Sequence, residues 1–140
     1  MTSALKCLGG LIASVPADVP NIIFLQEMVI NDLKLSQASE WIRDRYALTD
    51  VDNKNWENKY YGTTTLIDKR PWIDGVFGVH YETAMERDGL FVDVNVALPA
   101  TTESKILRLC NTHLESLEAD PPLRPGQVAA VARQLHSSEV

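Results

Sequence analysis

The sequence predicts an α/β fold in which an antiparallel-rich sheet is flanked by helices. Apolar and other residues alternate along residues 90–98, as in a strand with one buried face. A second alternating stretch ends at residues 111–113, so the two strands are expected to pair antiparallel. Helical spacing of apolar residues near both ends, in residues 1–15 and from Pro125 onward, predicts the flanking helices. Without a repeat or linker, residues 1–140 are expected to form one domain.

The first half of the chain predicts a helix, a buried strand and a second helix. In residues 1–15 the adjacent glycines each cost roughly 1 kcal/mol of helix propensity relative to alanine, so this helix needs a sheet to pack on. A strand covered on both faces is expected at residues 21–27, because four large apolar residues follow one another there. After a polar loop, Ser36 is a suitable N-cap for a helix with Trp41 and Tyr46 on one side.

The middle of the chain predicts a long loop and two further strands. Residues 49–59 are rich in Asp and Asn, as in an irregular surface connection, and Trp56 is interpreted as its anchor. The threonines in residues 60–67 favour a strand, and another strand is expected at residues 75–82. Asp88-Gly89 is a strong local signal for a hairpin turn before the alternating strand.

Two strand ends carry residues that could take part in catalysis or metal binding. His113 follows a half-buried strand, where a titratable donor could meet a substrate oxygen, although a single His at a strand end is more often structural. Glu27 directly ends the buried strand, where an acid needs a partner, water or a cation. A hard cation such as Mg²⁺ takes carboxylate oxygens and is often held by one or two protein acids. His80 and Glu82 share one face of a strand, but two ligands do not make a metal site.

Together, four motifs resemble those of the endonuclease/exonuclease/phosphatase superfamily. They are Ile-Phe-Leu-Gln-Glu at residues 23–27, Tyr-Gly-Thr at 61–63, Asn-Thr-His-Leu-Glu-Ser at 111–116 and Arg-Pro-Gly-Gln at 124–127. The branch that they resemble is that of tyrosyl-DNA phosphodiesterases acting on 5′ ends. The resemblance implies a partial two-sheet α/β sandwich of the deoxyribonuclease I-like kind.

The resemblance also implies roles for individual residues. Glu27 would bind the catalytic Mg²⁺ or Mn²⁺, His113 would contact the scissile phosphate as a catalytic residue, and Ser116 would lie at the substrate-binding cleft. Arg124 stands at a helix start, where its guanidinium could bind a substrate phosphate or pair structurally with Glu115.

The sequence departs from the family pattern at both ends. The family begins with a strand that ends in asparagine, whereas residues 1–15 already read as the following helix. The family's Gly-Asp-x-Asn strand and final Asp-His pair would lie beyond Val140. We therefore expect a domain truncated at both ends, inactive as given. Glu118 stands where the tyrosyl-DNA branch can carry a basic residue, which leaves the substrate open.

Composition limits the partners. A net charge of −6 argues against a broad nucleic-acid-coating surface but is compatible with a pocket for one phosphate. Cys7 and Cys110 have no paired spacing, which indicates neither a zinc site nor a disulfide framework and favours an intracellular protein, nuclear or cytoplasmic. No secretory signal or membrane-spanning run is expected.

Two functions remain open on the sequence. The first is a metal-dependent hydrolase of phosphodiester substrates, such as DNA ends in DNA repair, or a nuclease. The second is a non-catalytic remnant or interaction module that keeps half of the fold. In either case an uncovered sheet face would favour self-association or a partner that covers it.

Overall fold

The computed structural model describes residues 2–97, 103–118 and 121–137. In these residues the chain forms two antiparallel three-stranded sheets and four helices, which confirms the α/β class. The elements in order are α1 (Thr2–Ala13), β1 (Ile22–Met28), α2 (Ile30–Ala38), α3 (Glu40–Arg45), β2 (Tyr46–Leu48), β3 (Gly62–Asp68), β4 (Trp72–His80), β5 (Asp88–Ala97), β6 (Ser104–Thr112) and α4 (Arg124–Leu135).

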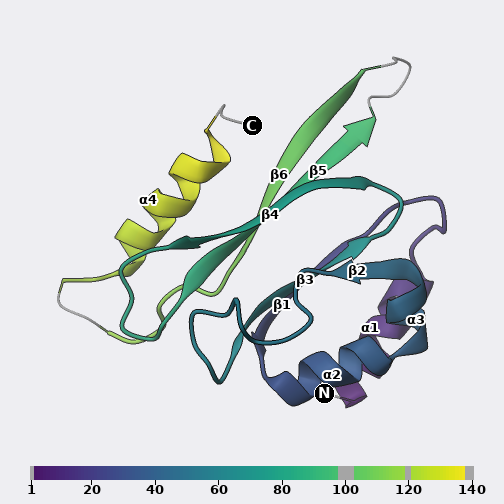
Figure 1. Ribbon diagram of the computed structural model, residues 1–140, viewed down its shortest axis with the longest axis horizontal. Coiled ribbons are helices and arrows are strands. Elements are labelled where there is room, and N and C mark those ends of the chain that lie inside the picture. The colour runs from purple at the N-terminus through teal and green to yellow at the C-terminus, as the bar shows by residue number, and fades with distance from the viewer. Residues whose placement is uncertain (1, 98–102, 119–120, 138–140) are drawn as a thin grey trace.

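The sheets lie between three helices on one side and a single helix on the other (Figure 1). The first sheet has the strand order β1-β3-β2, and α1, α2 and α3 gather on its outer side. The second sheet has the order β4-β5-β6, and α4 lies on the other side of the molecule beside it. Arg108 of β6 donates from Nη1 to the carbonyl oxygen of Gln134 in α4 at 3.1 Å, which ties this helix to the second sheet.

Apolar packing holds the layers together because each sheet buries residues on the side that meets its neighbour. Leu5 of α1, Ile42 of α3 and Leu66 of β3 belong to one core cluster between the first sheet and its helices. A second cluster joins the two sheets, with Ile67 of β3 against Val92 and Val94 of β5, all about 1% exposed. Consecutive residues of β3 therefore face different layers, as strand geometry requires.

The strands β5 and β6 pair antiparallel along their whole length, from Gly89 opposite Thr112 to Ala97 opposite Ser104, which confirms the predicted pairing. The burial of β5 differs from the prediction. Phe91 and Asp93 are buried as well as Val92 and Val94, so this strand is covered on both faces. The sequence also predicts a turn at residues 99–103, and residues 99–102 of it lie outside the described residues.

The prediction of a helix capped by Ser36 is wrong. The chain enters α2 at Ile30, and Ser36 lies inside this helix, fully buried, with its Oγ donating to the carbonyl oxygen of Asp32 at 2.9 Å. A serine that bonds the carbonyl four residues back is accommodated within a helix and does not start one. A second helix, α3, ends at Arg45, and Tyr46 begins the short strand β2.

The prediction of a hairpin turn at Asp88-Gly89 is also wrong. Both residues belong to β5, where Asp88 pairs with His80 and Gly89 pairs with Val79 and Thr112. A Cβ at Gly89 would lie 2.9 Å from the ring of Phe91. Glycine is therefore used here for close packing inside a sheet, and not for a turn conformation.

The loop after β2 is anchored by Trp56, as predicted, since this side chain is only 8% exposed. A Cβ at Gly62 would lie 2.3 Å from the Trp56 indole, so the ring packs directly on the backbone at the start of β3. Arg70, between β3 and β4, has a structural role. Arg70 forms an ion pair with the buried Asp68 at 2.6 Å and also donates to the carbonyl oxygen of Ala17.

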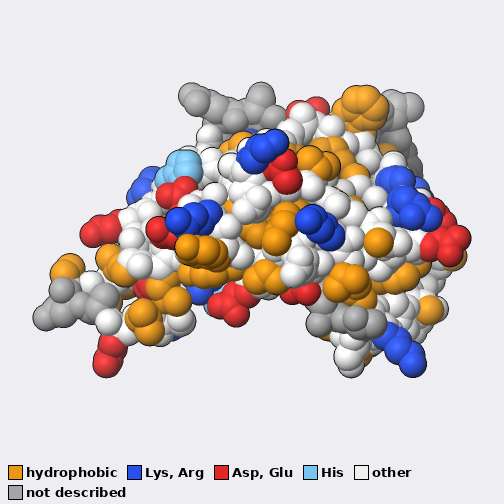
Figure 2. Space-filling model, turned by 60° about the horizontal axis from the view of Figure 1, so that its bottom comes forward, with side chains coloured by type: hydrophobic (Ala, Val, Ile, Leu, Met, Phe, Trp, Pro, Cys, Tyr) orange, Lys and Arg blue, Asp and Glu red, His pale blue; other side chains and the backbone are white. Residues whose placement is uncertain are grey.

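The surface carries both signs of charge. Figure 2 shows Lys and Arg side chains singly or in small groups among Asp, Glu and apolar side chains on the face that it presents. Some large apolar side chains are exposed, with Trp72 at 74% and Leu11 at 61%. Among the described residues, no helix has both the length and the apolar character needed to span a bilayer.

Candidate functional site

The ends of strands from both sheets meet at one place. Glu27 lies near the end of β1, and His113 directly follows β6. Tyr61 precedes β3 and Arg87 precedes β5. The sequence predicted that Glu27 and His113 share a site, and the structure brings them to 3.6 Å, measured from Oε1 of Glu27 to Nδ1 of His113.

Glu27 has an unusual backbone conformation, with φ of 53°. Few residues other than glycine adopt positive φ, and each such case costs free energy that the surrounding structure must offset. The register of β1 against β3 is irregular between Leu25 and Met28, around this residue. The irregularity interrupts the strand where the Glu27 side chain, 61% exposed, leaves the sheet.

Arg87 connects the two predicted residues. Its Nη1 lies 2.9 Å from Nδ1 of His113, and its Nη2 donates to Oε1 of Glu27 at 3.3 Å. The guanidinium carbon lies 4.9 Å from the ring centroid of Tyr61, within the range of a cation–π contact. Arg87 is 5% exposed, and its Nε is buried without a hydrogen-bond partner among the described residues. Arg87 is not among the site residues that the sequence motifs predict.

The Arg87 contact fixes the form of the His113 ring. A guanidinium only donates hydrogen bonds and stays charged, so the Nδ1 atom that it contacts must act as an acceptor. The neutral ring then carries its proton on Nε2. His113, 28% exposed, consequently offers an Nε2–H donor in this arrangement.

Asn111 sets the distance between the two sheets at the site. It is 1% exposed, and its Nδ2 donates to the carbonyl oxygens of Leu25 and Thr64, both at 3.2 Å, and to Oγ1 of Thr65 at 3.3 Å. The neighbouring Gln26 donates to the carbonyl oxygen of Thr112 at 2.7 Å. These bonds join the ends of β1, β3 and β6, so Glu27 and His113 are held by their immediate neighbours in sequence.

Glu115 anchors the segment that carries His113. It is 2% exposed, and its Oε2 accepts hydrogen bonds from Oγ1 of Thr83 and from the backbone N–H groups of Ala84 and Met85, at 2.9 to 3.2 Å. Burial would raise the pKa of Glu115, but these donors outweigh it and hold the pKa below its ordinary value. The segment before Arg87 is thereby fixed against the segment after His113.

The helix α4 contributes through its first turn. Gln127, 1% exposed, accepts from the backbone N–H of Glu115 at 2.8 Å and donates to the carbonyl oxygen of Glu82 at 3.0 Å. Arg124 donates from Nε to the backbone carbonyl oxygen of Glu115 at 2.6 Å. Arg124 thus pairs with Glu115 through the backbone and not through its carboxylate.

The remaining predicted residues lie near this cluster or apart from it. Ser116 is exposed, and its Oγ lies 3.4 Å from Sδ of Met85. His80 is 77% exposed, and its Nδ1 lies 2.6 Å from Oε2 of Glu57.

An ion of the kind that the resemblance implies would find one carboxylate here. Among the described residues, no three His, Cys, Asp or Glu side chains form a group able to hold a metal ion. Mg²⁺ can be held by one or two acids together with substrate phosphate, and Glu27 is largely exposed, so its carboxylate fits this use. The guanidinium of Arg87 competes for the same oxygen, Oε1.

In comparisons with protein-family models, with curated proteins and with solved structures, nothing matches this chain.

Proposed function

We propose that this chain carries the Glu–His part of the site of a divalent-metal-dependent phosphodiesterase that acts on nucleic-acid or tyrosyl-DNA ends. The motifs at residues 23–27 and 111–116, with their resemblance to deoxyribonuclease I-like enzymes, suggest this chemistry. The observation that supports it most is that Arg87 contacts both Glu27 and His113, three residues from separate parts of the sequence.

Each residue has a distinct part in the proposal. Glu27 would hold the Mg²⁺ or Mn²⁺ ion, which when bound neutralises charge on the phosphoryl oxygens. His113 donates its Nε2–H to a phosphoryl oxygen, where hydrogen bonds strengthen as negative charge develops. Arg87 contacts Nδ1 of His113, which directs the Nε2 side of the ring to the substrate, and adds a positive charge beside the phosphate.

The neighbouring residues position these groups. Tyr61 lies against the Arg87 guanidinium, and its hydroxyl donates to the carbonyl oxygen of Met85 at 2.8 Å. Glu115 fixes the segments that carry Arg87 and His113, while Ser116 and Arg124 stay proposed substrate contacts at the edge of the same region.

Binding and hydrolysis of a 5′-phosphotyrosyl oligonucleotide in Mg²⁺ test the proposal. We expect Glu27→Gln and His113→Ala each to weaken the Mg²⁺-dependent binding of this oligonucleotide by at least about tenfold, because a hydrogen bond or contact to a charged group contributes about 1.5–3 kcal/mol. His80→Ala is the matched control, because His80 is exposed and contacts Glu57 on another part of the surface.

The outcomes separate the two functions. Mg²⁺-dependent binding of the phosphotyrosyl end that is weakened in Glu27→Gln and His113→Ala but kept in His80→Ala supports the phosphodiesterase site, whether or not this chain hydrolyses the substrate. Phosphate-dependent binding that needs His113 but neither Mg²⁺ nor Glu27 would favour the interaction-module alternative. Equal behaviour of the His113→Ala and His80→Ala proteins would refute the site assignment.

A further inference from the structure

Arg87 is a buried cation whose nearest anion is an exposed acid. Among the described residues, Glu27 is the only one whose carboxylate lies within 4.0 Å of the Arg87 guanidinium. Glu115 also acts on Arg87 through its charge, but its Oε2 accepts from other donors. A guanidinium removed from water needs an anion, and in this arrangement Glu27 supplies it through Oε1 at 3.3 Å from Nη2.

The two partners differ in how firmly they are held. The backbone N–H of Arg87 donates to Oγ1 of Thr83 at 3.0 Å. Its guanidinium contacts His113 and lies against the ring of Tyr61. The carboxylate of Glu27, by contrast, is largely exposed and contacts only Arg87 and His113 in the described part of the chain. It can therefore move into water while the guanidinium stays in place.

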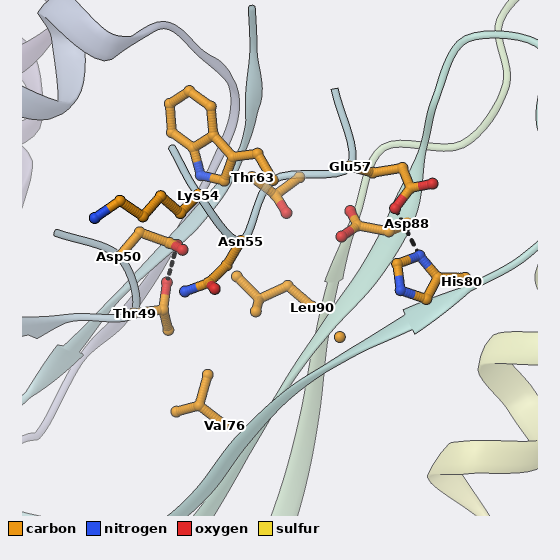
Figure 3. A pocket seen from close by; sticks show the side chains of 12 residues that line it. Thr49, Asp50, Lys54, Asn55, Glu57, Thr63, Val76, His80, Asp88 and Leu90 are labelled. Carbon is orange, nitrogen blue, oxygen red and sulfur yellow. Dashed lines mark hydrogen bonds and ion pairs between the residues drawn. The ribbon is translucent and has the colours of Figure 1, made fainter. Parts of the chain in front are cut away.

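The other open space beside Arg87 is unsuited to an anion. The small cavity that Arg87 and His113 line has a volume of about 10 Å³, enough for one water molecule. Glu57 and Asp88 line both this cavity and the larger one of about 520 Å³ drawn in Figure 3, where their acidic side chains disfavour an anion. The position held by the Glu27 carboxylate is therefore the one from which an anion reaches Nη2 of Arg87.

We propose that the Glu27 carboxylate occupies the position of a phosphate group on Arg87, and that a phosphate which displaces it frees Glu27 to hold a divalent ion. The phosphate takes over the hydrogen bond from Nη2 and lies beside His113. Phosphate and metal then assist each other's binding, because each needs the carboxylate away from Arg87. The metal half of this exchange rests on the proposed function, whereas the phosphate half rests only on the contact between Glu27 and Arg87.

Calorimetric titration of the full chain with a 5′-phosphotyrosyl oligonucleotide in EDTA tests the phosphate half. An oligonucleotide with a free 5′-hydroxyl measures the part of the affinity that does not depend on the phosphate. Glu27→Gln keeps the size of the side chain and removes the charge that competes with phosphate. We expect it to tighten phosphate-dependent binding at least about fivefold, which corresponds to a carboxylate that holds the position for about four-fifths of the time.

Glu86→Gln is the matched control. Glu86 is exposed and lines the small cavity beside Arg87, but it forms no ion pair with the guanidinium in the described part of the chain. In about 0.15 M salt its charge is largely screened, so this variant should change the affinity by less than about twofold.

The metal half predicts the opposite sign. In saturating Mg²⁺, Glu27 holds the ion beside the phosphate, so Glu27→Gln should bind the oligonucleotide more weakly than the wild type. The oligonucleotide should likewise raise the Mg²⁺ affinity of the wild type but not of Glu27→Gln, because coupling between two ligands is reciprocal. A change of sign between EDTA and Mg²⁺ is a result that a merely structural role of Glu27 does not give.

The exchange and the proposed function fail separately. Tighter binding in EDTA without weaker binding in Mg²⁺ would support displacement of Glu27 by phosphate but refute the metal site. Weaker binding in Mg²⁺ without tighter binding in EDTA would overturn the exchange and leave the proposed function standing.

A second variant guards against a failure to fold, which thermal unfolding would show. Asn suits the positive φ at position 27 and carries no charge, so Glu27→Asn should also tighten binding in EDTA. Unchanged or weaker binding in EDTA for both position-27 variants, or an equal gain in Glu86→Gln, would overturn the proposal.

Discussion

Replacing Asn111 with Asp should separate the two sheets at the candidate site. The Nδ2 atom of Asn111 lies between three oxygens, those of the Leu25 and Thr64 carbonyls and the Thr65 hydroxyl. Only a donor suits that position, so it must be the NH₂ end of the amide. Asp at position 111 has nearly the same shape but would place an acceptor, charged at neutral pH, against these oxygens.

The expected loss of unfolding free energy is large for a substitution that keeps the shape of the side chain. The two N–H bonds of the amide serve these three oxygens, so at about 0.5–1.5 kcal/mol per N–H their loss costs roughly 1–3 kcal/mol, and the desolvated carboxylate adds to it, because the site is 1% exposed. We therefore expect Asn111→Asp to lower the free energy of unfolding by at least about 3 kcal/mol at pH 7. Protonation of the new carboxyl restores one donor, so the loss should shrink as the pH falls.

Urea denaturation followed by tryptophan fluorescence measures the effect. Asn31→Asp is the matched control, because it is the same substitution at an exposed position of α2. It should alter the free energy of unfolding by less than about 0.5 kcal/mol. A loss below about 1 kcal/mol in Asn111→Asp, with an unchanged fold, would refute the role assigned to this amide.

Two further predictions concern packing and acid stability. Gly62→Ala should lower the free energy of unfolding by about 1–3 kcal/mol and alter Trp56 fluorescence, because its Cβ would lie 2.3 Å from the indole. Gly10→Ala, in α1 with nothing within 4 Å, should instead stabilise by about 0.5–1 kcal/mol, and equal effects in urea denaturation would contradict this. The hydrogen bonds from Arg70 hold the pKa of Asp68 well below its ordinary value, so Asp68 stabilises the fold above pH about 4 and loses this effect as the pH falls further. The difference in urea midpoint between wild type and Asp68→Asn should accordingly be largest near pH 7 and shrink below pH 4, and a difference independent of pH would contradict the ion pair.

The sequence predicted the elements whose patterns are long and uniform. Residues 90–98 alternate without a break, and their pairing with the following strand is the pairing that the structure has. The helix at Arg124 was predicted from Pro125 and from apolar spacing, both of which act locally. Where the outcome depended on tertiary contacts, prediction failed. Gly89 is a strand residue because the Phe91 ring leaves no room for a Cβ, and no local signal carries that information.

The candidate site was predictable only in part for the same reason. Glu27 and His113 stand at strand ends with recognisable motifs, and the structure brings them together. Arg87 precedes a strand, and its neighbours in the sequence do not distinguish it from a solvent-exposed loop arginine. Its burial and its contacts with Tyr61 and His113 arise from the docking of separate segments. In the sequence, the one local sign of a role for Arg87 is that this cationic side chain directly precedes β5, the most regularly alternating strand.

The bonds that tie β1 to β6 also determine when the site can form. Gln26 and Thr112 are 86 residues apart in sequence, and Asn111 contacts both Leu25 and Thr64. Contacts over such separations form late in folding, because the entropy of closing the intervening chain must be offset first. Neither sheet alone contains both Glu27 and His113, so a folding intermediate with one sheet formed has no site. The approach of Glu27 to His113 therefore reports the final docking of the two sheets, and amide exchange at Asn111 should be as slow as global unfolding.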